Sequence, residues 1–115
     1  MEERRHSQRF RAYLPVRMHG VTTPQVVETL TKDISLEGIQ CLSTIPCPVT
    51  SEVSLELALS TSNEVLELRG RTAWFRMIPH SDQFDVGIAF CDLSSQNKRR
   101  LSVYIDHLTG HLAAV

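Results

Sequence analysis

Residues 53–75, VSLELALSTSNEVLELRGRTAWF, contain the clearest alternation in the chain. From Val53 to Leu59 an apolar side chain occupies every second position, and neighbouring residues of a strand point to opposite faces of a sheet. This pattern predicts a strand with one buried face and one wet face. After the polar turn at 60–63, residues 65–75 form a second predicted strand that pairs with the first. Because Trp74 shares its parity with Leu66 and Leu68, we expect its indole in the core.

Outward from this hairpin, four further segments have the composition of short strands, rich in β-branched residues or alternating in polarity. They lie at residues 14–20, 25–32, 39–43 and 84–90. Gly20 and Gly38 permit turns, and Pro46 and Pro48 stop the third segment because proline cannot donate to a ladder. The chain is therefore predicted to be mainly β, with six to seven short antiparallel strands.

The C-terminal segment is predicted to be the helix of the fold. Ser94 or Ser95 can cap it, and Gly110 is expected to end it. Its apolar residues recur at helical spacing, at Leu101, Tyr104, Ile105 and Leu108. Short antiparallel strands commonly close into a barrel, which removes exposed edges, and an amphipathic helix can cover an open end.

The length of 115 residues is enough for one hydrophobic core. We expect a polar N-terminal arm over residues 1–12 and a single barrel domain over 13–115. The formal net charge is -1, so the chain has no general positive field for duplex nucleic acid. Its basic residues are locally concentrated, with Arg4, Arg5, Arg9 and Arg11 in the arm.

Three cysteines without a CxxC pair fit neither a disulfide framework nor a structural zinc site. The first residues, MEERRHSQRF, lack the apolar stretch of a signal peptide, and no apolar run is long enough to span a bilayer. These features predict a cytoplasmic protein with reduced thiols and no membrane insertion. Of the scattered histidines, His107 and His111 are spaced i, i+4, but no third ligand accompanies them, so no metal site is expected.

Two motifs carry the chemistry: Arg5-x-x-x-Arg9 in the arm, and Asp33-x-Ser35-x-x-Gly38 between two predicted strands. Together they resemble the PilZ family, and the resemblance extends through residues 70–74, residues 84–90 and the closing helix. It implies a PilZ-like β-barrel that binds the bacterial second messenger cyclic di-GMP between the arm and the barrel surface. Because one domain is expected, the receptor is predicted to act on a partner protein in trans, and no cofactor is expected.

The residue types agree with such a ligand. A guanidinium is a planar fork of donors that matches phosphate oxygens and the O6/N7 edge of guanine, so Arg5 and Arg9 suit a guanine dinucleotide. Asp33 can accept from guanine nitrogens, and Ser35 can donate to a phosphate. Gly38 allows a close backbone approach or a positive φ. Arg4, directly before the first motif, resembles an arginine of family members that take two intercalated ligand molecules.

Other functions are weighed against this one. A ligand-free interaction module of the same fold is the main alternative. It would be favoured if the arm packed as a regular strand or if Arg9 and Asp33 faced opposite sides of the barrel. Binding of RNA or a single strand would need a basic groove with exposed aromatic residues, whereas most of the seven aromatics fall on predicted inner faces. Because phosphate loops, paired catalytic carboxylates and HExxH motifs are absent from the sequence, no enzymatic activity is expected.

Overall fold

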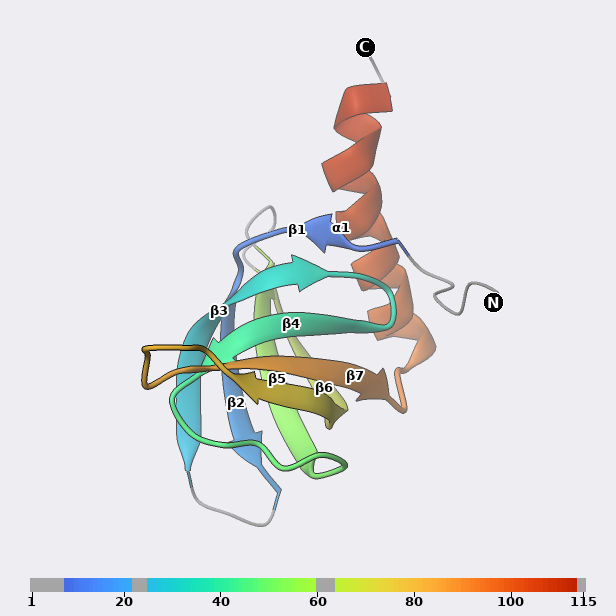
Figure 1. Ribbon diagram of the computed structural model, residues 1–115. Coiled ribbons are helices and arrows are strands. Elements are labelled where there is room, and N and C mark those ends of the chain that lie inside the picture. The colour runs from blue at the N-terminus through green and yellow to red at the C-terminus, as the bar shows by residue number, and fades with distance from the viewer. Residues whose placement is uncertain (1–7, 22–24, 60–63, 114–115) are drawn as a thin grey trace, which may run out of the picture.

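The computed structural model describes residues 8–21, 25–59 and 64–113, and within them the chain forms seven strands and one helix (Figure 1). In chain order the elements are β1 (Phe10–Arg11), β2 (Pro15–Gly20), β3 (Val26–Ile34), β4 (Gly38–Ser43), β5 (Glu52–Leu59), β6 (Glu64–Met77), β7 (Phe84–Cys91) and α1 (Ser95–Ala113). The predicted mainly β fold with a C-terminal helix is confirmed.

Six of these strands close into an antiparallel barrel. The order around the wall is β3, β2, β5, β6, β7 and β4, and pairing of β3 with β4 closes the ring. β1 adds a short seventh strand at the edge of β3. The predicted hairpin of 53–75 is present as β5 and β6, paired continuously from Glu52–Arg71 to Leu59–Glu64. Closure leaves no long strand edge open among the described residues.

The inward positions of the strands form one apolar core. The alternation of β5, and of β2 with the residue before it, is seen in the burial, with Leu14, Val16 and Met18 buried beside Leu55 and Leu57. Burial of such side chains contributes roughly 1.5–3 kcal/mol each. The barrel wall is therefore held rigidly from inside, and its outer face is free to carry polar chemistry.

The helix α1 lies beside the barrel and β1, and its C-terminal turns extend beyond the strands (Figure 1). Leu101, Tyr104 and Ile105 are buried against the core, as predicted. Ser94 is the N-cap, since its Oγ accepts a hydrogen bond of 3.1 Å from the Asn97 backbone N–H. Within the described residues, α1 is the one helix, and it lacks the length of apolar sequence required to cross a bilayer.

The prediction that Gly110 ends the helix is wrong, because α1 continues to Ala113. No glycine described by the structure has a positive φ, so no left-handed cap forms there. Glycine inside a helix costs about 1 kcal/mol relative to alanine, which weakens a helix without preventing its continuation.

Part of the region assigned to the arm is fixed to the barrel. Phe10 and Arg11 pair with Ile34 and Asp33. The buried Thr31 Oγ1 donates to the Ala12 carbonyl and accepts from the Leu14 N–H at 2.9 Å. The chain is thus held on β3 just after Arg9, which sets where the Arg9 side chain can reach.

Candidate functional site

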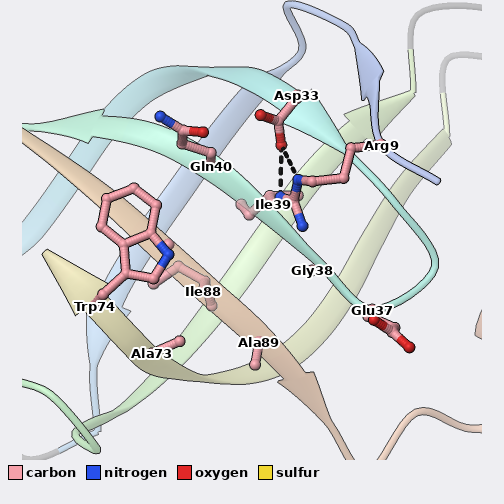
Figure 2. A pocket seen from close by; sticks show the side chains of 11 residues that line it. Arg9, Asp33, Glu37, Gly38, Ile39, Gln40, Ala73, Trp74, Ile88 and Ala89 are labelled. Atoms are coloured by element: carbon pink, nitrogen blue, oxygen red, sulfur yellow. Dashed lines mark hydrogen bonds and ion pairs between the residues drawn. The ribbon is translucent and has the colours of Figure 1, made fainter. Parts of the chain in front are cut away.

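An open pocket of about 470 Å³ lies on the outer wall of the barrel, over β4 and β7. Its floor is made of small residues and backbone, with Gly38, Gly87 and Ala89 among them. Arg9 and Asp33 border one side of it, and Trp74 borders the other (Figure 2). Successive side chains of a strand point alternately inward and outward, and the outward ones of neighbouring strands lie here at one level of the barrel.

The strand register explains how residues so distant in sequence come together. Asp33 on β3 is paired with Gln40 on β4, Gln40 with Gly87 on β7, and Gly87 with Trp74 on β6. Because adjacent strands lie about 4.8 Å apart, this cross-strand row spans roughly 14 Å. Across the four strands, the row therefore presents a carboxylate, an amide, a glycine without a side chain and an indole, in that order.

Arg9 and Asp33, one residue from each motif, form an ion pair at the pocket edge. The Arg9 Nε donates to Asp33 Oδ1 at 2.8 Å, and Arg9 Nη2 lies 2.5 Å from the same oxygen (Figure 2). About a quarter of each side chain is exposed, 28% for Arg9 and 23% for Asp33. Both groups therefore face the same side of the barrel, and each keeps unused donor or acceptor capacity toward the pocket.

Ser35 and Gly38 shape the loop that leads into β4. The Ser35 Oγ is buried and accepts from the Glu37 and Gly38 N–H groups at 3.0 and 3.2 Å, so it holds the turn. Ser35 does not line the pocket, and its predicted contact with a phosphate stays a prediction. Gly38 does line it, and a side chain there would collide with the Ile88 carbonyl across the β4–β7 pair. Of the two reasons weighed for this glycine, close backbone approach applies and positive φ does not.

Trp74 and Gln40 line the pocket, although the sequence pattern singled out neither as a site residue. Trp74 was expected in the core, and that prediction is wrong, since the residue is 38% exposed and lines the pocket. A β-bulge between Thr72 and Trp74 shifts the register against β7, so Thr72 is buried while Ala73 and Trp74 both point outward. A single extra residue thus moves Trp74 to the opposite face.

Gly87 and Arg76 position the indole. A Cβ on Gly87 would overlap the pyrrole edge of Trp74, so only a glycine at this point lets the ring lie against β7. The Arg76 guanidinium carbon lies 5.4 Å from the ring centroid, within the range of a cation–π contact. These two neighbours hold the aromatic face at the pocket wall.

Arg76 is itself held by Asp85, a carboxylate that is nearly buried on the outer wall. Asp85 accepts from Lys32 Nζ at 2.8 Å and from Arg76 Nη2 at 3.4 Å. Burial alone would raise the pKa of Asp85, but the hydrogen bonds and charges of Lys32 and Arg76 outweigh it, and the pKa falls below its ordinary value. A network of charged side chains therefore extends from Lys32 on β3 to the Trp74 indole on β6.

A second hollow of about 450 Å³ adjoins the first and shares Arg9, Asp33 and Gln40 with it. It adds Arg11, Tyr13 and Lys32, so cations dominate its lining. Arg4 and Arg5, the other predicted site residues, lie outside the described residues. Among the described residues, no group of three or more His, Cys, Asp or Glu side chains is arranged to hold a metal ion.

A small closed β-barrel with a polar, tryptophan-walled pocket on its outer surface is the class of protein that these features define. A family model described as the PilZ domain matches residues 3–107, and the chain belongs to this family. The resemblance inferred from the two motifs is thereby confirmed. A comparison with curated proteins gave no match.

Solved structures of low sequence identity share the fold. The chain is similar to the Bacillus subtilis inhibitor of motility MotI/DgrA, with 17% identity, a TM-score of 0.78, and coverage of 95% of this chain and 53% of that one. It is also similar to the PilZ domain of YcgR from Escherichia coli with c-di-GMP, with 15% identity, a TM-score of 0.73, and coverage of 96% and 95%. The third similar structure is the K. pneumonia MrkH–c-di-GMP complex, with 16% identity, a TM-score of 0.76, and coverage of 99% and 57%. The chain thus spans about half the length of the MotI and MrkH chains.

Proposed function

We propose that this protein is a non-enzymatic receptor for cyclic di-GMP, which binds in the pocket over β4 and β7. The observation that carries the proposal is the Arg9–Asp33 pair facing Trp74 across a floor of glycine and alanine. Family membership supports it, and so do the similar YcgR and MrkH structures, which are complexes with c-di-GMP.

Each wall of the pocket suits one part of a guanine nucleotide. The flat floor and the Trp74 indole suit the faces of a purine, because aromatic stacking needs no hydrogen-bond partner. Asp33 can accept from the N1 and N2 donors of guanine, while Arg9 can donate to O6, N7 or a phosphate. Gln40, between them, supplies both a donor and an acceptor.

The arm completes the site in this proposal. Arg4 and Arg5 precede the segment that is fixed on β3, so on ligand binding they can close over the pocket and form a new surface for a partner protein in trans. Ordering a residue costs about 1–2 kcal/mol, and the charge-assisted contacts have to exceed that cost. The adjoining cation-rich hollow supports the expectation that Arg4 accompanies a second bound ligand.

Calorimetric titration with cyclic di-GMP, with GTP and linear pGpG as controls, tests the proposal. Because Trp74 is the sole tryptophan, its fluorescence reports on the pocket wall in the same samples. We expect selective binding with a change in tryptophan emission, and the fitted stoichiometry separates one ligand from two. If saturating cyclic di-GMP gives neither heat nor emission change, the protein is instead a ligand-free interaction module.

A further inference from the structure

The wall of the barrel opposite the pocket carries an exposed apolar row. Pro15 on β2 is paired with Leu30 on β3, and Ala58 on β5 is paired with Val65 on β6. Pro15 adjoins Ala58, since the next pair along β2 and β5 is Val16–Leu57. Leu30 is 50% exposed and Val65 is 55% exposed. Four strands in succession thus present an apolar side chain to the outside at one level.

A charged row runs parallel to the apolar one, two residues further along each strand. Arg17 is paired with Glu28 on one side and with Glu56 on the other, and Glu56 is paired with Glu67. The Arg17 guanidinium lies 3.5 Å from Glu28 and 3.8 Å from Glu56, so its charge is already shared between two carboxylates. The row keeps a clear excess of negative charge.

A groove of about 470 Å³ lies between these rows, lined by Pro15, Leu30, Ala58 and Val65 on the apolar side and by Arg17, Glu28 and Glu56 on the charged side. Exposed apolar side chains beside a polar rim are typical of protein interaction sites. In the ring of six strands, β2 and β5 lie opposite β7 and β4. The groove therefore faces away from the pocket of the proposed function.

We propose that this groove docks a segment of a partner protein in which apolar side chains are flanked by lysine or arginine. Apolar residues of that segment would cover Leu30 and Val65, and its cations would meet Glu28, Glu56 and Glu67. The carboxylates repel nucleic acid and anionic lipid headgroups. A second copy of this chain is also a poor occupant, because a two-fold contact would bring two carboxylate rows into one interface. The small area of the groove indicates a transient contact rather than an obligate one.

Two labelled synthetic peptides of equal length test the charge requirement, one alternating leucine with lysine and the other alternating leucine with glutamate. Binding is measured by fluorescence anisotropy against the wild-type protein, Glu56→Lys, and the matched control Asp82→Lys, which makes the same charge change at an exposed turn residue outside the groove. We expect the lysine peptide alone to bind, with affinity reduced about tenfold by Glu56→Lys and unchanged by Asp82→Lys.

The apolar requirement is tested with Leu30→Ser against Val103→Ser, a change at an exposed apolar residue on α1. We expect Leu30→Ser alone to weaken binding, and amide chemical shifts to move on β2, β3, β5 and the first half of β6. Equal binding of both peptides, equal effects of the groove and control variants, or shifts confined to other elements would overturn the proposal. So would a wild-type dimer that Leu30→Ser converts to a monomer, since a second copy would then occupy the groove.

This inference does not depend on the proposed function. Saturating cyclic di-GMP is expected to leave the affinity of the lysine peptide unchanged within twofold, because the two sites lie on opposite walls. Competition between cyclic di-GMP and the lysine peptide would contradict the placement of the two sites on opposite walls. Failure of the protein to bind cyclic di-GMP would leave the peptide results standing.

Discussion

Arg9 is the residue at which the arm, the barrel and the pocket meet. In this structure its guanidinium is committed to Asp33, and both side chains are only partly exposed. A ligand that bridges them exchanges a protein ion pair for two charge-assisted contacts of its own. The fixed position of Phe10 and Arg11 on β3 means that Arg9 is positioned before ligand arrives.

Arg9→Ala is therefore expected to weaken cyclic di-GMP binding at least tenfold. Removing one partner of a desolvated charged contact costs about 2–5 kcal/mol, and about 1.4 kcal/mol corresponds to tenfold in affinity. Calorimetry measures the change, and Arg17→Ala, which removes an arginine from the opposite wall, is the matched control. Equal affinities for wild type and Arg9→Ala would contradict the role assigned to the pair.

Gly87→Ala is expected to displace the Trp74 indole from β7, because the added Cβ would overlap the ring. Trp74 is a surface side chain, so the ring can swing away and the barrel can still fold. We expect a changed tryptophan emission in the free protein and weaker cyclic di-GMP binding by calorimetry. A wild-type emission spectrum in Gly87→Ala would show that the glycine does not position the ring.

At this scale the sequence allowed a partial prediction of the site. The two motifs correctly brought Arg9 and Asp33 together, because residue type and spacing are visible in a sequence. Trp74 was misplaced, since strand parity holds only while the register is unbroken and nothing in residues 70–75 indicates the bulge. The predicted ligand contact of Ser35 stays a prediction. Its oxygen also accepts from two backbone N–H groups, and this part of its role depends on the geometry of the folded turn.

At the scale of elements, Asp85 joins β7 to β3 and β6 through Lys32 and Arg76. Burial acts to raise the pKa of Asp85, but Lys32 and Arg76 lower it by more than burial raises it. The pKa of this carboxyl is therefore lower in the folded protein than in the unfolded chain. Its contribution to stability is therefore present above the ordinary pKa of 3.8 and is lost as pH falls through the folded pKa.

Asp85→Asn should remove that contribution, so that the variant loses less stability than wild type on acidification. Urea unfolding followed between about pH 3 and pH 7 measures the difference, and the two proteins should differ most at the neutral end. The exposed Asp82→Asn serves as the control. Parallel pH profiles for wild type and Asp85→Asn would rule out the proposed linkage.

The elements themselves were largely predictable because their patterns are local. Alternation identified β2, β5 and the first half of β6, and the spacing of Leu101, Tyr104 and Ile105 identified α1. The end of α1 was misplaced, since a glycine can either terminate a helix or lie within it, and residue type alone does not distinguish the two outcomes. β1 was not predicted either, because a strand of two residues is too short to show a periodic pattern.

At the scale of the whole molecule, barrel closure determines which side chains meet solvent. Burial raises the pKa of the Cys41 thiol to about 12, with the neighbouring Cys47 and Asp85 adding to the effect, and burial also raises the pKa of Cys47. Cys91, at the end of β7, is only partly buried. Since the thiolate is the reactive form, the three cysteines should differ widely in reactivity.

In the native protein a thiol reagent at about pH 8 should label Cys91 first and leave Cys41 unlabelled until the barrel unfolds. Mass spectrometry of labelled peptides measures the order, and the protein in urea, where all three should react, provides the control. Rapid native labelling of Cys41 would mean that the barrel opens far more readily than its core packing indicates.

The ring order of the strands was not predictable from alternation, which shows where strands lie but not which are neighbours. The pairing of β4 with both β3 and β7 depends on contacts between distant parts of the chain. The resemblance to a known family supplied the barrel, and the local patterns agreed with it.

The cross-strand row under the pocket has a consequence for how the protein is made. Asp33 and Gln40 emerge early in synthesis, whereas Trp74 and Gly87 emerge late, so the pocket cannot exist on a nascent chain until β7 has paired. A molecule that binds there stabilises only the complete barrel and does not stabilise partly folded chains. Incomplete or mispaired chains therefore do not bind that molecule, and they do not compete for it with the folded protein.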